Sequence, residues 1–266
     1  MPRIFPTEEQ YLPYRRVAWD AYLLFCPAYD NVLASLEAEY VRAVRELPTR
    51  EPKKKQAHNV RQHLAEHLMA YYWRGKLTID NPLLTEFFRL AADNLRGHAI
   101  DSVGRWLASR PETAATIEDD VLTRLRSVWE WRLRVAQDSE DVKLCQDELS
   151  RFGWWFASRK FDESWSLGQL RTVLERVKSI KPEFKVAETL EAIAPRFPFE
   201  CVQCARLMAQ TDREGWEVYG NEKHFKAIIT AAMTSGNVDA RVAADGLIQY
   251  MVGRGNFEYR ALLPGT

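Results

Sequence analysis

Apolar residues recur every three or four positions along almost the whole chain, which is the spacing of one face of an α-helix. In one stretch they occupy positions 142, 145, 149, 152 and 156, and in another positions 167, 170, 174 and 177. No comparable run alternates with the period of two that indicates a half-buried β-strand. The pattern therefore predicts an all-α protein.

Residues with capping chemistry separate these apolar stripes. Asn81 followed by Pro82 fits an N-cap and the first position of a helix. Ser235 and Gly236 indicate a helix end, with Gly236 in the left-handed conformation, and Asn237 then caps a new helix. We expect helices at about residues 7–25, 28–47, 56–75, 82–93, 95–110, 117–137, 140–160, 165–180, 184–194, 198–211, 221–235 and 237–252, with a short turn over 257–263.

The links between the expected helices are short, so consecutive helices should pack antiparallel. A helix pair takes roughly 40 residues, which is within the range of HEAT repeats. We therefore expect antiparallel helical pairs stacked as a HEAT-like α-solenoid, with a globular all-α bundle as the alternative. No low-complexity linker divides the chain, which predicts a single domain over residues 1–266 with a soft boundary near 47–56, LPTREPKKKQ.

Composition narrows the class of protein further. The 266 residues carry 37 basic and 37 acidic side chains, and 46% of the residues are hydrophobic. The apolar content argues against a disordered chain, and the zero net charge makes a nucleic-acid partner an unfavoured expectation. No apolar run reaches the length of a membrane span, the start MPRIFPTEEQ lacks a signal-peptide core, and four cysteines make no disulfide framework. We expect a cytoplasmic protein without membrane contact.

One short motif has the spacing of a zinc site. His63, Glu66 and His67 match H-x-x-E-H, in which two histidines on one helix face bind zinc and the glutamate activates water. A catalytic zinc needs a third protein ligand, and nothing in the sequence singles one out. The motif also fits the polar face of an ordinary surface helix, so we expect no bound metal and keep a zinc-dependent hydrolase as an alternative function.

Other candidate chemistry is limited. Cys201 and Cys204 form a single C-x-x-C, which without a second pair or a strand-to-helix setting indicates helix packing. The chain has neither G-x-x-x-x-G-K-[ST] nor G-x-G-x-x-G, so we expect no cofactor. Lys53–Lys55 is the densest basic run; it favours a solvated loop, with a nucleic-acid-binding helical repeat as an alternative.

Aromatic residues are the most suggestive feature. Trp154 and Trp155 are adjacent, and one helix face cannot bury both because neighbours point about 100° apart. One of them must pack against another helix pair or face a partner, and tryptophan and arginine are enriched in binding hot spots. The candidate partner-binding residues are Trp154, Arg159, Lys160, Trp216 and Tyr219.

Three stretches carry a resemblance to a known class of protein. They are VRQHLAEHLMAYYWRGKL with DNLRGHAIDSVGRWL, SVWEWRLRVA with ELSRFGWWFASRKFDESWSLGQL, and the segment 212–263 that begins DREGWEVYGN. Together they resemble the C-terminal helical-repeat region of large bacterial STAND-like NTPases of antiviral defence. In such proteins an effector and a nucleotide-binding switch precede the helical region, which senses or scaffolds.

The resemblance and the helical pattern lead to one expected function. We expect a non-enzymatic helical-repeat interaction module, a sensor or scaffold of a bacterial defence NTPase system. The expected partner is a protein, for example a nucleotide-binding domain in cis or in trans.

Overall fold

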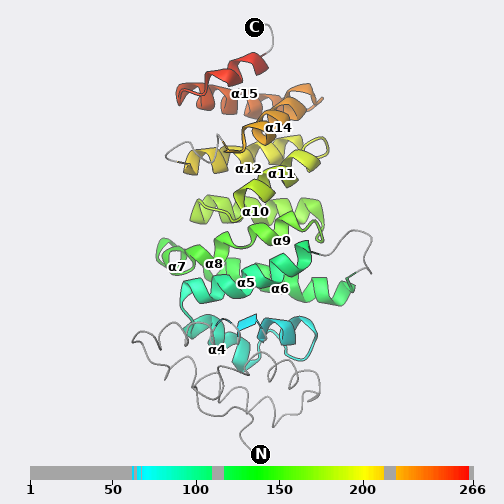
Figure 1. Ribbon diagram of the computed structural model, residues 1–266, viewed down its shortest axis with the longest axis vertical. Helices are drawn as coiled ribbons and strands as arrows, with labels where there is room; N and C mark the ends of the chain where they lie inside the picture. The colour runs from blue at the N-terminus through cyan, green and yellow to red at the C-terminus, as the bar shows by residue number, and fades with distance from the viewer. Residues whose placement is uncertain (1–61, 63–64, 67, 110–116, 213–219, 264–266) are drawn as a thin grey trace, which may run out of the picture. The chain divides into compact units, whose positions relative to one another are not determined.

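The computed structural model describes residues 62, 65–66, 68–109, 117–212 and 220–263 (Figure 1). Every regular element among these residues is a helix, which confirms the all-α prediction. Backbone contacts group the chain into two compact units. The first contains residues up to Val103 together with Ile117–Val128, and the second contains residues from Gly104 to 116 and from Trp129 onward. The soft boundary expected near 47–56 lies outside the described residues.

The first unit holds a helical segment that ends at Trp73, helix α4 (Pro82–Leu90), and parts of α5 (Asp93–Ala108) and α6 (Asp119–Val135). Two hydrogen bonds join α6 to the end of the first helical segment. The Tyr72 hydroxyl donates to the carbonyl of Arg124 at 2.9 Å, and Nη1 of Arg124 donates to the carbonyl of Trp73 at 3.0 Å. Arg124 therefore fixes the C-terminal turn of that segment, whose backbone groups have no helical partner of their own.

The second unit contains the remaining helices, which appear in chain order in Figure 1. They are α7 (Ser139–Leu144), α8 (Gln146–Ser150), α9 (Gly153–Ala157), α10 (Glu163–Val177), α11 (Glu183–Ile193), α12 (Pro198–Thr211), α14 (Glu222–Thr234), α15 (Val238–Gly253) and the 3-10 helix η1 (Phe257–Leu262). Helices α8, α10, α12 and α15 contact one another in that order, and α9, α11, α14 and η1 do the same. The two series also contact each other, so the unit has two layers of helices.

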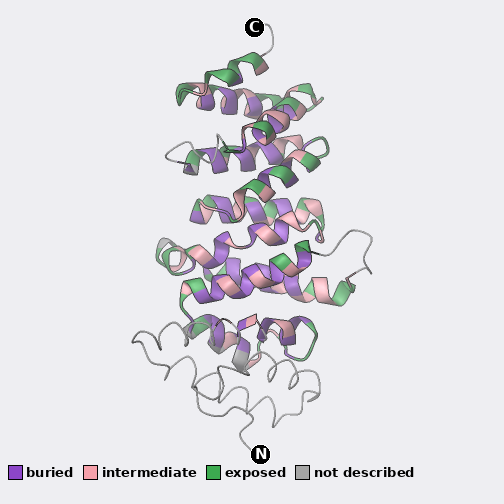
Figure 2. Cartoon of the chain, in the orientation of Figure 1, coloured by how far each residue is buried: buried purple, intermediate pink, exposed green. Residues whose placement is uncertain are grey.

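The helices are amphipathic in the way the sequence predicts. On α10 the buried residues include Leu167, Leu170, Leu174 and Val177, which is the predicted stripe. The longer helices of the second unit, α10, α11, α12, α14 and α15, each carry both buried and exposed positions (Figure 2). The apolar side chains therefore fill the space between helices, and burying that area is the main force that holds the layers together.

The single helix expected over 140–160 is wrong, because three short helices occupy this segment. Cys145 leaves the helical conformation at φ −124° and ψ 16°. Farther along, the carbonyl of Ser150 accepts a hydrogen bond from the N–H of Lys181 at 2.8 Å instead of continuing a helix. A Cβ on Gly153 would lie 2.5 Å from the carbonyl oxygen of Lys181, so only glycine permits this close approach.

Within the described residues, the other predicted helix boundaries lie within a few residues of the observed ones. The helices expected over 7–25 and 28–47 lie outside the described residues. Oδ1 of Asn237 accepts from the N–H of Ala240 at 3.1 Å, so Asn237 is the predicted N-cap of α15. The left-handed conformation expected at Gly236 is not adopted. Ser235 ends α14 instead, by turning to an extended conformation with φ −69° and ψ 153°. The helix break therefore depends on Ser235 and Asn237.

Candidate interaction site

A cavity of about 330 Å³ opens in the second unit, between the last turn of α5, helix α9 and helix α11. Helices α9 and α11 pack directly against each other, which fixes two of its walls. The lining residues are Ala108, Trp154, Ala157, Arg159, Lys185, Glu188, Thr189 and Ala192. Two of the residues proposed from sequence for partner binding, Trp154 and Arg159, thus line one cavity.

Trp154 forms the aromatic wall of the cavity. Its neighbour Trp155 is fully buried, whereas Trp154 is only partly buried, which is the outcome required by their 100° separation. A Cβ on Gly104 would overlap the Cβ of Trp154 and would lie 2.8 Å from Cδ1 of Trp155. The guanidinium of Arg105 lies over the Trp154 ring, 5.2 Å from its centroid. Gly104 and Arg105 therefore hold this indole in place.

Trp155 belongs to a buried aromatic cluster beneath the cavity. The rings of Trp129 and Phe152 stack with their centroids 4.9 Å apart, and Trp155 meets Phe152 edge-on at 5.0 Å. Phe161 stacks on Trp155 at 6.0 Å. Such pairs favour fixed relative orientations beyond simple burial. The cluster anchors α9, and with it the position of Trp154.

Arg159 occupies an unusual backbone position. It follows α9 with φ 54°, in the left-handed region that is more often occupied by glycine or asparagine at a helix end. Its N–H donates to the carbonyl of Phe156 at 3.1 Å. A residue with a Cβ bears a small conformational cost in this region. Nη2 of Arg159 lies 3.3 Å from Oε1 of Glu163, and the pair is partly exposed.

Helix α11 supplies the opposite wall. Lys185, Glu188, Thr189 and Ala192 are spaced as i, i+3, i+4 and i+7, so they share one helix face. Nζ of Lys185 lies 2.6 Å from Oε2 of Glu188. That hydrogen bond from Lys185 lowers the pKa of the Glu188 carboxyl below its usual value. At neutral pH the wall therefore presents an ammonium next to a carboxylate.

The other predicted partner-binding residues lie elsewhere. Lys160 is partly buried, its N–H donates to Oγ of Ser158 at 3.3 Å, and it does not line the cavity. Trp216 and Tyr219 lie outside the described residues. Sequence reasoning missed Lys185 and Glu188, although their spacing of three within an expected helix indicates an ion pair on one face.

The zinc motif is described only at its glutamate. His63 and His67 lie outside the described residues, whereas Oε1 of Glu66 lies 2.7 Å from Nε2 of His98 in the first unit. No group of three or more His, Cys, Asp or Glu residues among the described part of the chain is placed to bind a metal. The basic run Lys53–Lys55 also lies outside the described residues.

Cys201 and Cys204 lie on α12 and are fully buried. Burial raises the pKa of the Cys204 thiol to about 12 and also raises the pKa of Cys201 well above its usual range. Cysteine chemistry depends on the thiolate. These two thiols are therefore suited to packing between helices, as their place on an apolar face predicts.

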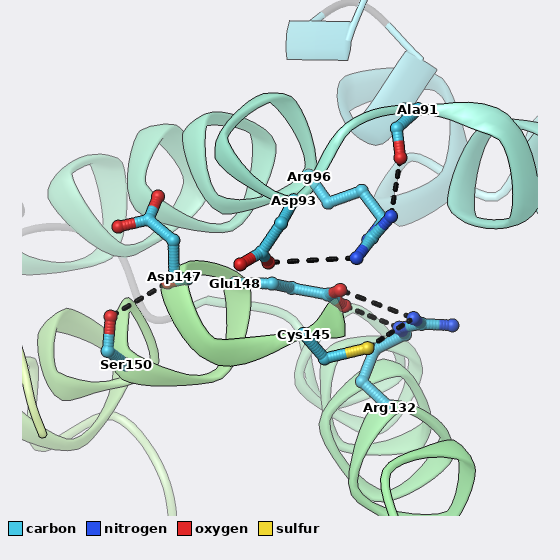
Figure 3. Close-up of polar contacts among 8 residues, drawn as sticks. All are labelled: Ala91, Asp93, Arg96, Arg132, Cys145, Asp147, Glu148 and Ser150. Atoms are coloured by element: carbon cyan, nitrogen blue, oxygen red, sulfur yellow. Dashed lines mark hydrogen bonds and ion pairs between the residues drawn. The ribbon is translucent and has the colours of Figure 1, made fainter. Parts of the chain in front are cut away.

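A buried ion pair between Arg132 and Glu148 lies within the second unit (Figure 3). Nε and Nη2 of Arg132, on α6, donate to the two carboxylate oxygens of Glu148, on α8, the second at 3.2 Å. Nη2 also lies 3.9 Å from Sγ of Cys145. The two charged side chains are only 4% and 0% exposed. This pair joins two helices and does not line the cavity between α9 and α11.

Comparison with protein families, with curated proteins and with solved structures finds no match to this chain. No helix within the described residues is both long enough and apolar enough to cross a bilayer. The cavity between α9 and α11 brings an indole, two cations and a carboxylate together in one lining.

Proposed function

We propose that this protein is a non-enzymatic helical-repeat interaction module, a sensor or scaffold that binds a protein partner through the cavity between α9 and α11. The observation that carries the proposal is the convergence of the Trp154 indole with the Arg159 and Lys185 cations on one cavity. Tryptophan and arginine are the side chains most often found at binding hot spots. A partly exposed indole held from behind by Gly104 is a rigid contact surface of this kind.

The layering of the second unit supports a HEAT-like α-solenoid in preference to a globular bundle. Each helix contacts the helix two places along in its own layer, as in α8 with α10 and α9 with α11. Stacked helix pairs produce this pattern because every pair rests mainly on its neighbours. Solenoids of this type present extended side surfaces to partners, and α11 exposes one such surface at the cavity.

The lining chemistry favours binding over catalysis. Lys185 is engaged by Glu188, and the hydroxyl of Thr189 donates to the carbonyl of Lys185 at 2.8 Å. These contacts fix the side chains of Lys185, Glu188 and Thr189 in the α11 wall of the cavity. The methyl groups of Ala108, Ala157 and Ala192 complete the cavity lining.

We further propose that the partner belongs to a bacterial STAND-like NTPase defence system and that the protein acts in the cytoplasm. The support for this part is the resemblance of three stretches, among them Glu148–Leu170, to the helical region of such NTPases. The cavity residues Trp154 and Arg159 lie within that stretch. The expected partner is a nucleotide-binding domain, in cis or in trans.

Site-specific photo-crosslinking in the source cells tests the proposal. A photoreactive amino acid replaces Ala192, which is exposed and lines the cavity, and the same amino acid at exposed Ala261 on η1 reports non-specific adducts. We expect one protein adduct from position 192, lost when Trp154→Ala is added, and identified by mass spectrometry as a P-loop NTPase.

The possible results separate the two parts of the proposal. The same adducts from positions 192 and 261, or no adduct from position 192, would overturn the interaction function. A specific adduct with a protein that lacks a nucleotide-binding domain would overturn the defence assignment alone. A circular dichroism spectrum of the Trp154→Ala variant checks that the helices remain folded.

A further inference from the structure

We infer that the cavity between α9 and α11 recognises an acidic peptide segment of a partner protein, with an apolar side chain against Trp154 and carboxylates on Arg159 and Lys185. The inference rests on the proposed function and adds the chemistry of the partner. Three properties of the lining lead to it: hydrogen-bond donors left over on the cations, an apolar floor, and a size suited to side chains.

Arg159 has donors to spare. A guanidinium presents five N–H groups, whereas among the described residues this side chain meets a single carboxylate oxygen, that of Glu163 at 3.3 Å. The same oxygen lies closer, at 2.7 Å, to Nη2 of Arg196. Glu163 is therefore shared between two arginines, and Arg159 is left only partly neutralised. A carboxylate from a partner would find a planar pair of donors there.

Lys185 contributes a second cation on the facing wall. One of its three ammonium protons is directed to Glu188, and Nζ also lies over the Phe184 ring, 5.7 Å from its centroid. The side chain is 42% exposed, so a partner carboxylate can still reach the ammonium. The lining thus carries two cations against one carboxylate. Since the chain as a whole has zero net charge, the cavity is a local positive excess on a neutral protein.

The rest of the lining is apolar and small. Besides Trp154, three alanines line the cavity: Ala108, Ala157 and Ala192. The Arg105 guanidinium lies over one face of the Trp154 ring, 5.2 Å from its centroid. An apolar or aromatic side chain can lie against this surface while neighbouring carboxylates reach the two cations, so a mixed acidic and apolar segment satisfies both parts.

A peptide fits this site better than a nucleic acid. The volume of about 330 Å³ is at the lower end of ligand pockets and holds a few side chains. Nucleic-acid binding normally uses a broad basic surface that makes several phosphate contacts, whereas this cavity lining carries two cations. The i, i+3, i+4, i+7 face of α11 instead offers regularly spaced contacts to an extended segment.

The test begins with selection from a displayed library of short random peptides on the full-length protein. We expect the enriched peptides to combine Asp or Glu with an apolar or aromatic residue. Fluorescence anisotropy then measures each peptide against the protein and its variants. The variant with Arg159→Gln and Lys185→Gln should bind about tenfold more weakly, and binding to the unchanged protein should weaken as salt is raised to about 0.15 M.

Two further variants make the result decisive. Glu188→Gln removes the carboxylate of the cavity lining and should tighten the binding of acidic peptides by severalfold, an effect that a damaged fold would not produce. Arg241→Gln makes a matched charge change on the exposed surface of α15 and should leave binding unchanged.

Neutral or basic enriched peptides, or equal affinity of the acidic peptides for all variants, would overturn the inference. So would a displayed library that yields no peptide dependent on Trp154. The proposed function is tested by a different result, because it fails only when crosslinking at position 192 captures no specific partner protein. A partner that is captured at position 192 and survives Arg159→Gln with Lys185→Gln would keep the interaction module and reject acidic recognition.

Discussion

Arg132 and Glu148 form a bidentate ion pair between α6 and α8, and both side chains are almost completely buried. Removing one partner of such a pair leaves an uncompensated charge in the interior. We therefore expect Glu148→Gln to lower the free energy of unfolding by about 3 kcal/mol or more. Urea denaturation followed by circular dichroism measures this loss.

The control is an ion pair in water. Arg171 and Glu175 are each 47% exposed, and Glu175→Gln should cost at most about 0.5 kcal/mol. Replacing both Arg132 and Glu148 with apolar residues should recover much of the stability lost in the single variant. A Glu148→Gln protein as stable as the unchanged one would contradict the burial of this pair.

Gly104 allows α5 to approach α9. A Cβ at this position would overlap the Cβ of Trp154, so Gly104→Ala should destabilise the protein by about 1–3 kcal/mol through overpacking. Gly168 lies on α10, and a Cβ added there would meet no atom within 4 Å. Gly168→Ala should raise stability by about 0.5–1 kcal/mol, because alanine is the better helix former. Urea denaturation of the two variants checks this, and we expect a lower midpoint for Gly104→Ala and a higher one for Gly168→Ala. Equal shifts of the two midpoints would exclude a close approach at Gly104.

The thiols of Cys201 and Cys204 should be unreactive in the folded protein. Both are buried, and burial raises the pKa of Cys204 to about 12, so the thiolate is scarce at neutral pH. Iodoacetamide followed by peptide mapping should find these two sites unlabelled in the native protein and labelled in guanidinium. Mapping also separates them from Cys26. Rapid native labelling at either site would show that α12 is not packed as described.

Alkaline pH should weaken the first unit through Tyr72. Burial raises the pKa of its hydroxyl to about 12, whereas an unfolded tyrosine has a pKa of about 10. The protonated form is therefore favoured in the folded state. Its contribution to stability is fully present below about pH 10 and is lost as pH rises through about 12.

Tyr72→Phe tests this assignment. The variant loses the hydrogen bond to the carbonyl of Arg124 and should be less stable by about 1 kcal/mol at neutral pH. Its urea midpoint should then fall less steeply between neutral pH and about pH 11 than that of the unchanged protein. Parallel pH curves for the two proteins would assign the alkaline loss to other groups, such as Tyr259, whose pKa burial also raises.

Local signals predicted most of the described helices but not the breaks in the helix expected over 140–160. Stripes such as Leu167 to Val177 depend only on neighbours in sequence, so periodicity detects them. The break after Ser150 depends on a hydrogen bond from Lys181, about thirty positions away. A contact between distant segments does not change the spacing of apolar residues, so the sequence pattern cannot reveal it. The apolar spacing through Phe152 and Phe156 therefore favoured one continuous helix.

The candidate site was predictable in part for the same reason. The angle between Trp154 and Trp155 requires them to face different surroundings, but it does not say which of them is buried. The cavity brings α9 together with Lys185 and Glu188, whose proximity depends on packing between α9 and α11. Helical spacing alone could identify the Lys185–Glu188 pair but not the tryptophan opposite it.

The adjacency of Trp154 and Trp155 has a mechanical consequence. Because Trp155 is wedged among the rings of Phe152 and Phe161, the indole that faces the cavity shares a rigid helix with the aromatic core. The wall is thus preorganised, and a ligand would spend little free energy on ordering it. We expect free and bound cavities to have the same shape, without induced fit. Differences in affinity between variants would then come mainly from the rate at which the ligand dissociates. Substitutions in the aromatic core would change the lifetime of the complex although the core residues do not contact the ligand.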